Sequence, residues 1–273
     1  IVFAPYFGEY RSYAANFDAS VVEVAPDYET FQPDLEAFAQ AVRVQTKAVI
    51  VNTPNNPTGV IYHEDTMRKI GEILEAKEKE IGHEIYLISD EPYRELVYDG
   101  NKEDFLTQYY KNTLVGYSFS KSLSLPGERI GYVVVPDEAD DADLLIEGIT
   151  VSNRTLGFVN APSLMQKAVA RCLDEKTNLA FYDENRKMLY EGLKALGFSC
   201  IKPEGAFYMW VKSPDEDEAK FVAAGKKYNI IMVKGSAFGC AGYVRLAYCV
   251  SHETVKNSLK AFEKLAAEYH LHE

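Results

Sequence analysis

Three short apolar runs constrain the fold of this chain more than any other feature. They are AVIVN at residues 48–52, EIYLIS at 84–89 and TLVGY at 113–117. Largely unbroken apolar runs are typical of parallel strands that are covered on both faces. Residues 31–44 and 64–79, which lie between or before these runs, have the spacing of amphipathic helices. We therefore predict an α/β protein with a mostly parallel sheet, right-handed crossovers and helices on both faces.

The pattern changes after Pro136, and the chain divides into two expected domains. Before it, further strands are expected at 1–4, 21–24 and 129–135, and a helix at 9–16. After it, the expected helices are 139–149, 161–173, 177–196, 216–228 and one from residue 252, and the expected strands are 199–202, 207–211, 230–233 and 243–248. This order predicts a large domain over residues 1–175, then a bridging helix and a smaller α+β domain over 176–273.

The charge and the cysteines exclude several classes of protein. A formal net charge of −12 argues against nucleic acid or an anionic membrane as the main partner, because either needs a basic face. No apolar run approaches the roughly 20 residues of a membrane span. The cysteines lack ligand spacing, and we interpret them as reduced core residues of a cytoplasmic protein without a metal site. They are Cys172, Cys200, Cys240 and Cys249.

Polar residues follow three of the predicted strands at their carboxyl ends. They are Asn52, Asp90 and Lys121. Ligands bind beyond this end of the strands in open α/β sheets. We therefore expect the three side chains to border one crevice.

The stretch YSFSKSLSLPGERIGY at residues 117–132 combines a lysine with serines and an arginine. The hydroxyls and the Arg129 guanidinium could hold a phosphate. The amine of Lys121 could attack an aldehyde, because the pKa of a lysine falls readily near other cations or on burial. Taken alone, the stretch favours a loop lysine among turn-forming serines, and the rest of the chain has to decide.

Five motifs occur in one order: NTPNNPTG from Asn52, DEPY from Asp90, SFSK ending at Lys121, GERIGY around Arg129 and YVRLAY around Arg245. Together they resemble the fold type I pyridoxal-phosphate aminotransferases of class I/II, over nearly the whole chain. The resemblance implies the large domain of that fold, the cofactor pyridoxal 5'-phosphate, amino acid and 2-oxo acid substrates, and a homodimer.

The resemblance also implies the catalytic roles. Lys121 would form the Schiff base with the cofactor and then move the proton. Asp90 would pair with the pyridine nitrogen and keep it protonated, so that the ring can accept electrons. Tyr93 and Asn52 would hydrogen-bond the ring's phenolic oxygen. From the residues alone, Asp90 could also be a strand-end cap and Asn52 a turn former.

The remaining roles concern the phosphate, the ring and the substrate. Ser118, Ser120 and Arg129 would bind the phosphate, since a guanidinium fork suits that group. Phe7 in PYFGEY would stack on the cofactor ring, or be ordinary core. The two substrate arginines would be Arg245, for the α-carboxylate, and Arg154 in SNRTLGFVNAP, for a side-chain carboxylate; Arg154 is equally a solvated loop residue. A charge between Val244 and Leu246 is costly to bury unless it is paired, which favours a functional Arg245.

The resemblance predicts an amino acid:2-oxo acid aminotransferase that works by ping-pong half-reactions. Two alternatives remain open: a C–S β-lyase that uses the same lysine and aspartate, and a non-catalytic aminotransferase-like sensor domain. Family members also begin well upstream of Ile1, with a glycine-rich phosphate loop and an aromatic residue that reaches the partner's site. We therefore expect this sequence to lack an N-terminal part.

Overall fold

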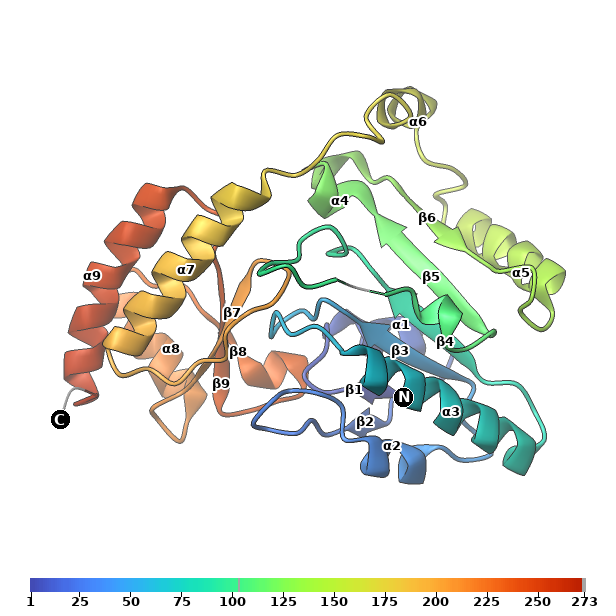
Figure 1. Cartoon of the computed structure of the whole chain (residues 1–273), viewed down its shortest axis with the longest axis horizontal. Helices are drawn as coiled ribbons and strands as arrows, with labels where there is room; N and C mark the ends of the chain where they lie inside the picture. Colours follow the sequence, from blue (N-terminus) through green and yellow to red (C-terminus); the bar gives the residue numbers. More distant parts are fainter. Residues whose placement is uncertain (103, 272–273) are drawn as a thin grey trace.

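The larger sheet has six strands. In this computed structural model, which describes residues 1–102 and 104–271, the strand order is β2-β1-β3-β4-β5-β6 (Figure 1). Its strands are β1 Val2–Phe3, β2 Glu23–Val24, β3 Ala48–Asn52, β4 Tyr86–Asp90, β5 Thr113–Ser118 and β6 Gly131–Val134. Neighbours pair in parallel except β5 and β6, which are antiparallel. The prediction of a mostly parallel sheet is confirmed.

Helices cover both faces of this sheet. Val49 and Val51 of β3 belong to an apolar cluster that includes Phe38 and Ile70, whereas Ile50 packs in a second cluster with Tyr10. Successive residues of a strand point to opposite faces, so the two clusters lie on opposite sides. The helices that supply them are α2 Leu35–Ala41 and α3 Glu64–Ile81 on one side and α1 Glu9–Ala15 on the other.

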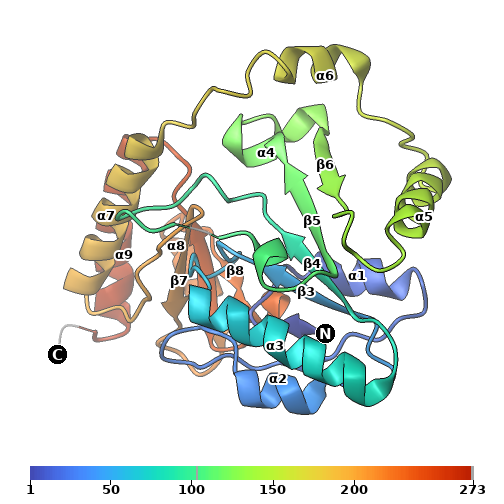
Figure 2. The same cartoon turned by 45° about the vertical axis from the view of Figure 1, so that its right-hand side comes forward.

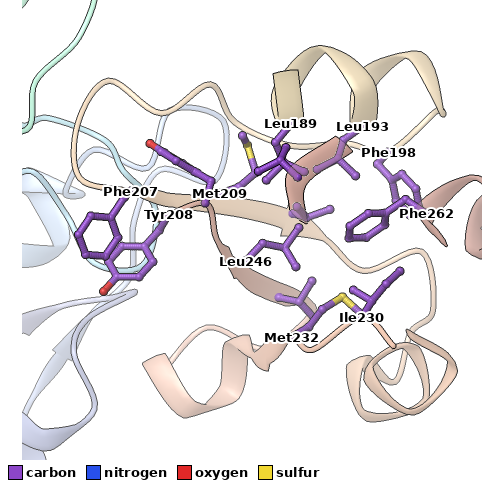
Figure 3. Packing of buried hydrophobic residues seen from close by; sticks show 14 of the residues in the cluster. Leu189, Leu193, Phe198, Phe207, Tyr208, Met209, Ile230, Met232, Leu246 and Phe262 are labelled. Atoms are coloured by element: carbon purple, nitrogen blue, oxygen red, sulfur yellow. The ribbon is translucent and has the colours of Figure 1, made fainter. Parts of the chain in front are cut away.

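A smaller antiparallel sheet follows, in the order β7-β9-β8. Its strands are β7 Tyr208–Lys212, β8 Val233–Lys234 and β9 Tyr243–Ala247. The helices of this part of the chain are α7 Leu179–Ala195, α8 Glu218–Lys227 and α9 His252–Glu268. α7 and α9 lie side by side in both views (Figures 1 and 2). The core between these helices and the sheet contains Leu193, Phe198, Leu246 and Phe262, and it extends to Phe207 at its other end (Figure 3).

Several expected boundaries are wrong. The helix expected at 31–44 begins only at Leu35, because Phe31 has a positive φ of 56° and the Asp34 side chain caps the helix at the Ala37 N–H. The expected strand at 199–202 makes only an isolated bridge between Cys200 and Val211. The helices expected at 139–149 and 161–173 are α5 Ala142–Thr155 and α6 Ser163–Val169.

Two further expectations concern the cysteines, expected to be reduced core residues, and membrane-spanning segments, expected to be absent. All four cysteines are free. Cys249 is exposed, because it lies beyond the last residue of β9, and the expectation that it is a core residue is wrong. None of the helices in the described ranges is long and apolar enough to cross a membrane.

β6 forms one edge of the larger sheet, and its apolar side chains are open to solvent. Tyr132, Val133 and Val134 are 49%, 52% and 41% exposed. α5 and α6 lie beyond this edge in both views, with exposed apolar residues of their own such as Leu144 and Leu164 (Figures 1 and 2).

Candidate active site

The carboxyl ends of β3, β4 and β5 place the three predicted strand-end residues on one side of the sheet. Asn52 is the last residue of β3 and pairs in register with Asp90, the last residue of β4. Lys121 lies on α4 Phe119–Ser122, a single turn that follows β5 directly. Ser118 begins that turn, since its hydroxyl accepts a hydrogen bond from the Ser120 N–H at 3.2 Å.

The Asp90 carboxylate is half-buried, and within the described residues one side chain donates a hydrogen bond to it. Tyr10 of α1 donates its hydroxyl proton to Asp90 Oδ2 at 2.5 Å. Burial raises the pKa of Asp90, the Tyr10 hydrogen bond opposes this rise, and the neighbouring Glu91 charge adds to it. Sequence reasoning missed Tyr10. Its only sequence signal is the helical spacing from Phe7, whose half-buried ring lies 5.7 Å from the Tyr10 ring.

Two asparagines link Asp90 to Arg245. Asn52 donates its side-chain amide to the Asp90 carbonyl at 2.8 Å, and its Oδ1 accepts from the Asn56 N–H at 2.8 Å. Asn56 Oδ1 in turn accepts from Arg245 Nη1 at 2.8 Å. Asn52 therefore holds two loops together, while Asn56 faces the arginine. Asn56, in the same NTPNNPTG motif, was not singled out from the sequence.

The Lys121 side chain lies near the aromatic rings of Tyr93 and Phe207. Its ammonium nitrogen lies 5.8 Å from the centre of the Tyr93 ring and 5.5 Å from that of Phe207. Burial lowers the pKa of Lys121; Cys249 opposes this effect, and the charges of Arg245 and Arg129 add to it. A lysine of this kind has more of the free, nucleophilic amine at neutral pH than an exposed one.

Arg245 lies on β9 against two aromatic rings. Its guanidinium carbon lies 4.4 Å from the centre of the Tyr208 ring and 4.8 Å from that of Phe238. The Tyr208 hydroxyl lies 2.8 Å from the Tyr93 hydroxyl. Arg245 Nε is buried without a hydrogen-bond partner within the described part of the chain. A buried cationic donor in that state favours an anionic ligand.

The predicted phosphate-binding residues and Arg154 are less tightly grouped. Ser118 and Ser120 share a hydroxyl–hydroxyl hydrogen bond of 2.8 Å. The exposed Arg129 donates to the carbonyl of Pro126 at 2.6 Å, within its own turn. Arg154 lies exposed in the last turn of α5, so its expected loop position is wrong.

A cavity of about 580 Å³ opens beside the strand ends. Asp90 and Ser118 line one part of it, and Thr150 and Asn153 of α5 line another. Lys121 and Arg245 are not among its lining residues, so the hydrogen-bonded and stacked residues described above define the site better than the cavity does.

Comparison with known proteins decides the family. The family model "Aminotransferase class I and II" matches residues 1–262. The chain belongs to the class I and II aminotransferases. Members of this family use pyridoxal 5'-phosphate and act on amino acids and 2-oxo acids, and the chain is a pyridoxal-phosphate-dependent aminotransferase.

Similar aminotransferases are found both by sequence and by structure. The aspartate/prephenate aminotransferase of Thermus thermophilus is 32% identical over 275 residues, which cover 97% of this chain and 68% of that protein. An aminotransferase structure from Eubacterium rectale has a TM-score of 0.95 at 49% identity, over 98% of this chain and 67% of that one. The aspartate aminotransferase of Thermotoga maritima is 31% identical over 96% of this chain and 68% of that protein. The chain thus spans about two thirds of these relatives, and their names favour neither the lyase nor the sensor.

The residues present in this aminotransferase fit its cofactor. Asp90 is a half-buried carboxylate whose pKa is raised by burial, and a protonated ring nitrogen beside it would offset this effect and favour the ionised form. Lys121 has a lowered pKa and faces the same side of the sheet. Arg245 has a buried, unpartnered Nε in the described structure, as a receptor for a substrate carboxylate should.

Proposed function

We propose that Lys121 is the residue that carries the cofactor covalently in this aminotransferase and moves the proton during amino transfer. The observation that supports it most directly is the position of the Lys121 amine, 5.8 Å from the Tyr93 ring on the turn after β5, with its pKa lowered by burial. The lowered pKa lets the amine act both as nucleophile and as base near neutral pH. Ping-pong half-reactions at this one site would serve the amino acid and the 2-oxo acid in turn.

Asp90 would hold the ring nitrogen of the cofactor in its protonated form. When bound, pyridoxal 5'-phosphate supplies an electron sink for the substrate Cα. A cationic partner would stabilise the Asp90 carboxylate and bring its pKa back down. The Tyr10 hydroxyl would keep that carboxylate oriented through its 2.5 Å hydrogen bond.

Arg245 would receive the α-carboxylate of the substrate, with Asn56 fixing the orientation of the guanidinium. Nη1 is held by Asn56, so the remaining donors can face a carboxylate. Tyr93 would donate to the phenolic oxygen of the cofactor. Asn52 would contribute through the strand ends that it joins.

Ser118, Ser120 and Arg129 would bind the cofactor phosphate, and Phe7 would stack on its ring. The pair of serine hydroxyls supports this assignment. Arg129 would have to exchange its Pro126 carbonyl for the phosphate, a change within one short turn.

The relatives' names suggest a substrate with a second carboxylate. They include aspartate and prephenate, and one structure of the Thermus thermophilus aspartate aminotransferase contains maleate. We propose Arg154 as the residue that reads a side-chain carboxylate. We also propose a cytoplasmic homodimer, with a large domain over residues 1–175 and a smaller one over 176–273.

Visible absorbance with added pyridoxal 5'-phosphate tests the central proposal. The wild-type protein should show the band of a lysine-bound cofactor, and Lys121→Ala should lose that band and at least roughly 10²-fold in activity. Lys220→Ala, an exposed lysine of α8, is the matched control and should keep both. A Lys121→Ala protein that retains the band would disprove the assignment.

A further inference from the structure

Tyr208 lies between the proposed substrate site and the proposed cofactor site. Its hydroxyl is 2.8 Å from that of Tyr93, and the Arg245 guanidinium carbon is 4.4 Å from its ring centre. Figure 3 shows Tyr208 next to Phe207, at the end of the apolar cluster away from Leu193, Phe198 and Phe262. Tyr208 is thus one side chain in contact with both Arg245 and Tyr93.

We propose that Tyr208 is a positioning residue that transmits the occupancy of the Arg245 carboxylate site to the Tyr93 hydroxyl. This inference rests on the proposed function, because it takes Arg245 as the carboxylate receptor and Tyr93 as the residue that faces the cofactor. In this proposal Tyr208 acts through its contacts with Arg245 and Tyr93.

Both hydroxyls of the Tyr93–Tyr208 contact belong to buried residues. Tyr93 is 3% exposed and Tyr208 is 6% exposed, so each hydroxyl depends on the other for a hydrogen bond rather than on bulk water. If Tyr208 donates to the Tyr93 oxygen, the Tyr93 proton is directed away from Tyr208 and becomes available to the cofactor. Hydrogen bonds in such a chain polarise and strengthen one another.

Tyr208 is the better hydrogen-bond donor of the two tyrosines, and Arg245 lies beside it. Burial raises the pKa of both; in addition, Tyr208 and Asp90 raise the pKa of Tyr93, whereas the Tyr93 hydrogen bond lowers that of Tyr208. The Arg245 charge lowers the pKa of both tyrosines, and its guanidinium lies over the Tyr208 ring. A substrate carboxylate on Arg245 would neutralise that charge and weaken the Tyr208 donor. The Tyr93 hydrogen bond to the cofactor would then weaken as well.

Other charges also face this pair. Asp90 acts on Tyr93, Cys249 acts on Tyr208, and the Lys121 amine lies over the Tyr93 ring. All of them stay in place in Tyr208→Phe, which removes one oxygen and keeps the ring under Arg245. The variant therefore isolates the hydroxyl contact.

The test is the pH titration of the visible band of the lysine-bound cofactor, with and without maleate as a carboxylate that has no amino group. A weaker Tyr93 hydrogen bond disfavours the ionised phenolic oxygen, so the band's apparent pKa should rise by about 0.4 to 1 unit in Tyr208→Phe. Maleate should raise the wild-type pKa and shift that of the variant by less than half as much. Tyr248→Phe, which removes another buried hydroxyl of this region, is the control and should titrate as wild type.

A double-mutant cycle with Tyr93→Phe tests the route. Once the Tyr93 hydroxyl is gone, Tyr208→Phe should cause no further shift. An equal shift in both backgrounds, a wild-type titration of Tyr208→Phe, or failure of Tyr208→Phe to fold would each overturn the proposal. Absence of the band in the wild-type protein would instead overturn the role of Lys121, so the two failures are distinguishable.

Discussion

The Tyr10 hydroxyl donates to the Asp90 carboxylate at 2.5 Å, and it joins the first helix of the chain to the end of β4. This hydrogen bond opposes the burial that raises the pKa of Asp90. It therefore stabilises the ionised form of Asp90, which is the form that a protonated cofactor nitrogen requires.

We expect Tyr10→Phe to weaken cofactor binding. Loss of a hydrogen bond to a charged group costs about 1.5–3 kcal/mol, which corresponds to roughly a 10- to 100-fold weaker affinity for pyridoxal 5'-phosphate. Absorbance titration of the apoprotein measures this. Tyr13→Phe, an exposed tyrosine on the same helix, should change the affinity less than twofold. Equal affinities for wild type and Tyr10→Phe would contradict the role of Tyr10.

The rate at which the apoprotein captures pyridoxal 5'-phosphate should depend on the ionisation of Lys121. Only the free amine attacks, so the rate should rise with pH and then reach a plateau. The midpoint of this rise should lie below 10.5, the ordinary pKa of a lysine. Arg245→Leu removes a positive neighbour, which favours the ammonium form, and should move the midpoint upward. Stopped-flow absorbance gives both midpoints, with Nα-acetyl-lysine as the unperturbed reference. A wild-type midpoint at or above that reference would refute the prediction.

Gly59 should tolerate no side chain. It has a φ of 75°, and a Cβ would lie 2.7 Å from the Pro203 Cβ and 3.1 Å from the Tyr208 carbonyl oxygen. Gly100 has the same φ, but no atom lies within 4 Å of its Cβ position in the described structure. We expect Gly100→Ala to cost about 1 kcal/mol of unfolding free energy through backbone strain, and Gly59→Ala about 1–3 kcal/mol more through overpacking. Denaturant unfolding measures the difference, and equal losses would argue against close packing at Gly59.

Arg154→Ala should distinguish substrates if Arg154 reads a second carboxylate. We expect kcat/KM for aspartate to fall about 10-fold, the equivalent of 1.4 kcal/mol, while that for alanine changes less than twofold. Arg171→Ala, another exposed arginine, should affect neither substrate. Equal losses for aspartate and alanine would remove Arg154 from the site.

The sequence predicted the sheet and the strand-end residues well for a physical reason. Apolar runs such as AVIVN have few alternatives to a buried strand, and the ends of parallel strands meet at one edge. Tyr10, Asn56 and Tyr208 could not be found in the same way. Tyr10 reaches Asp90 across 80 positions of sequence and Tyr208 reaches Tyr93 across 115, so no local pattern marks either contact.

Local backbone conformation explains the errors in the boundaries. The helical spacing of residues 31–44 does not reveal that Phe31 adopts a positive φ or that the Asp34 side chain caps the helix. Residues 199–202 lie along the edge of β7 that does not pair with β9: the Lys212 N–H donates to the Ser199 carbonyl and the Ile201 N–H to the Trp210 carbonyl, but only one bridge forms, between Cys200 and Val211.

The open edge at β6 determines how this polypeptide behaves in concentrated solution. Tyr132, Val133 and Val134 expose apolar surface on a strand that pairs only with β5 within the described ranges. Such an edge is a template for adding strands from other molecules. We therefore expect molecules of this protein to associate through β6 at high concentration, and a charged residue on this strand to reduce that association.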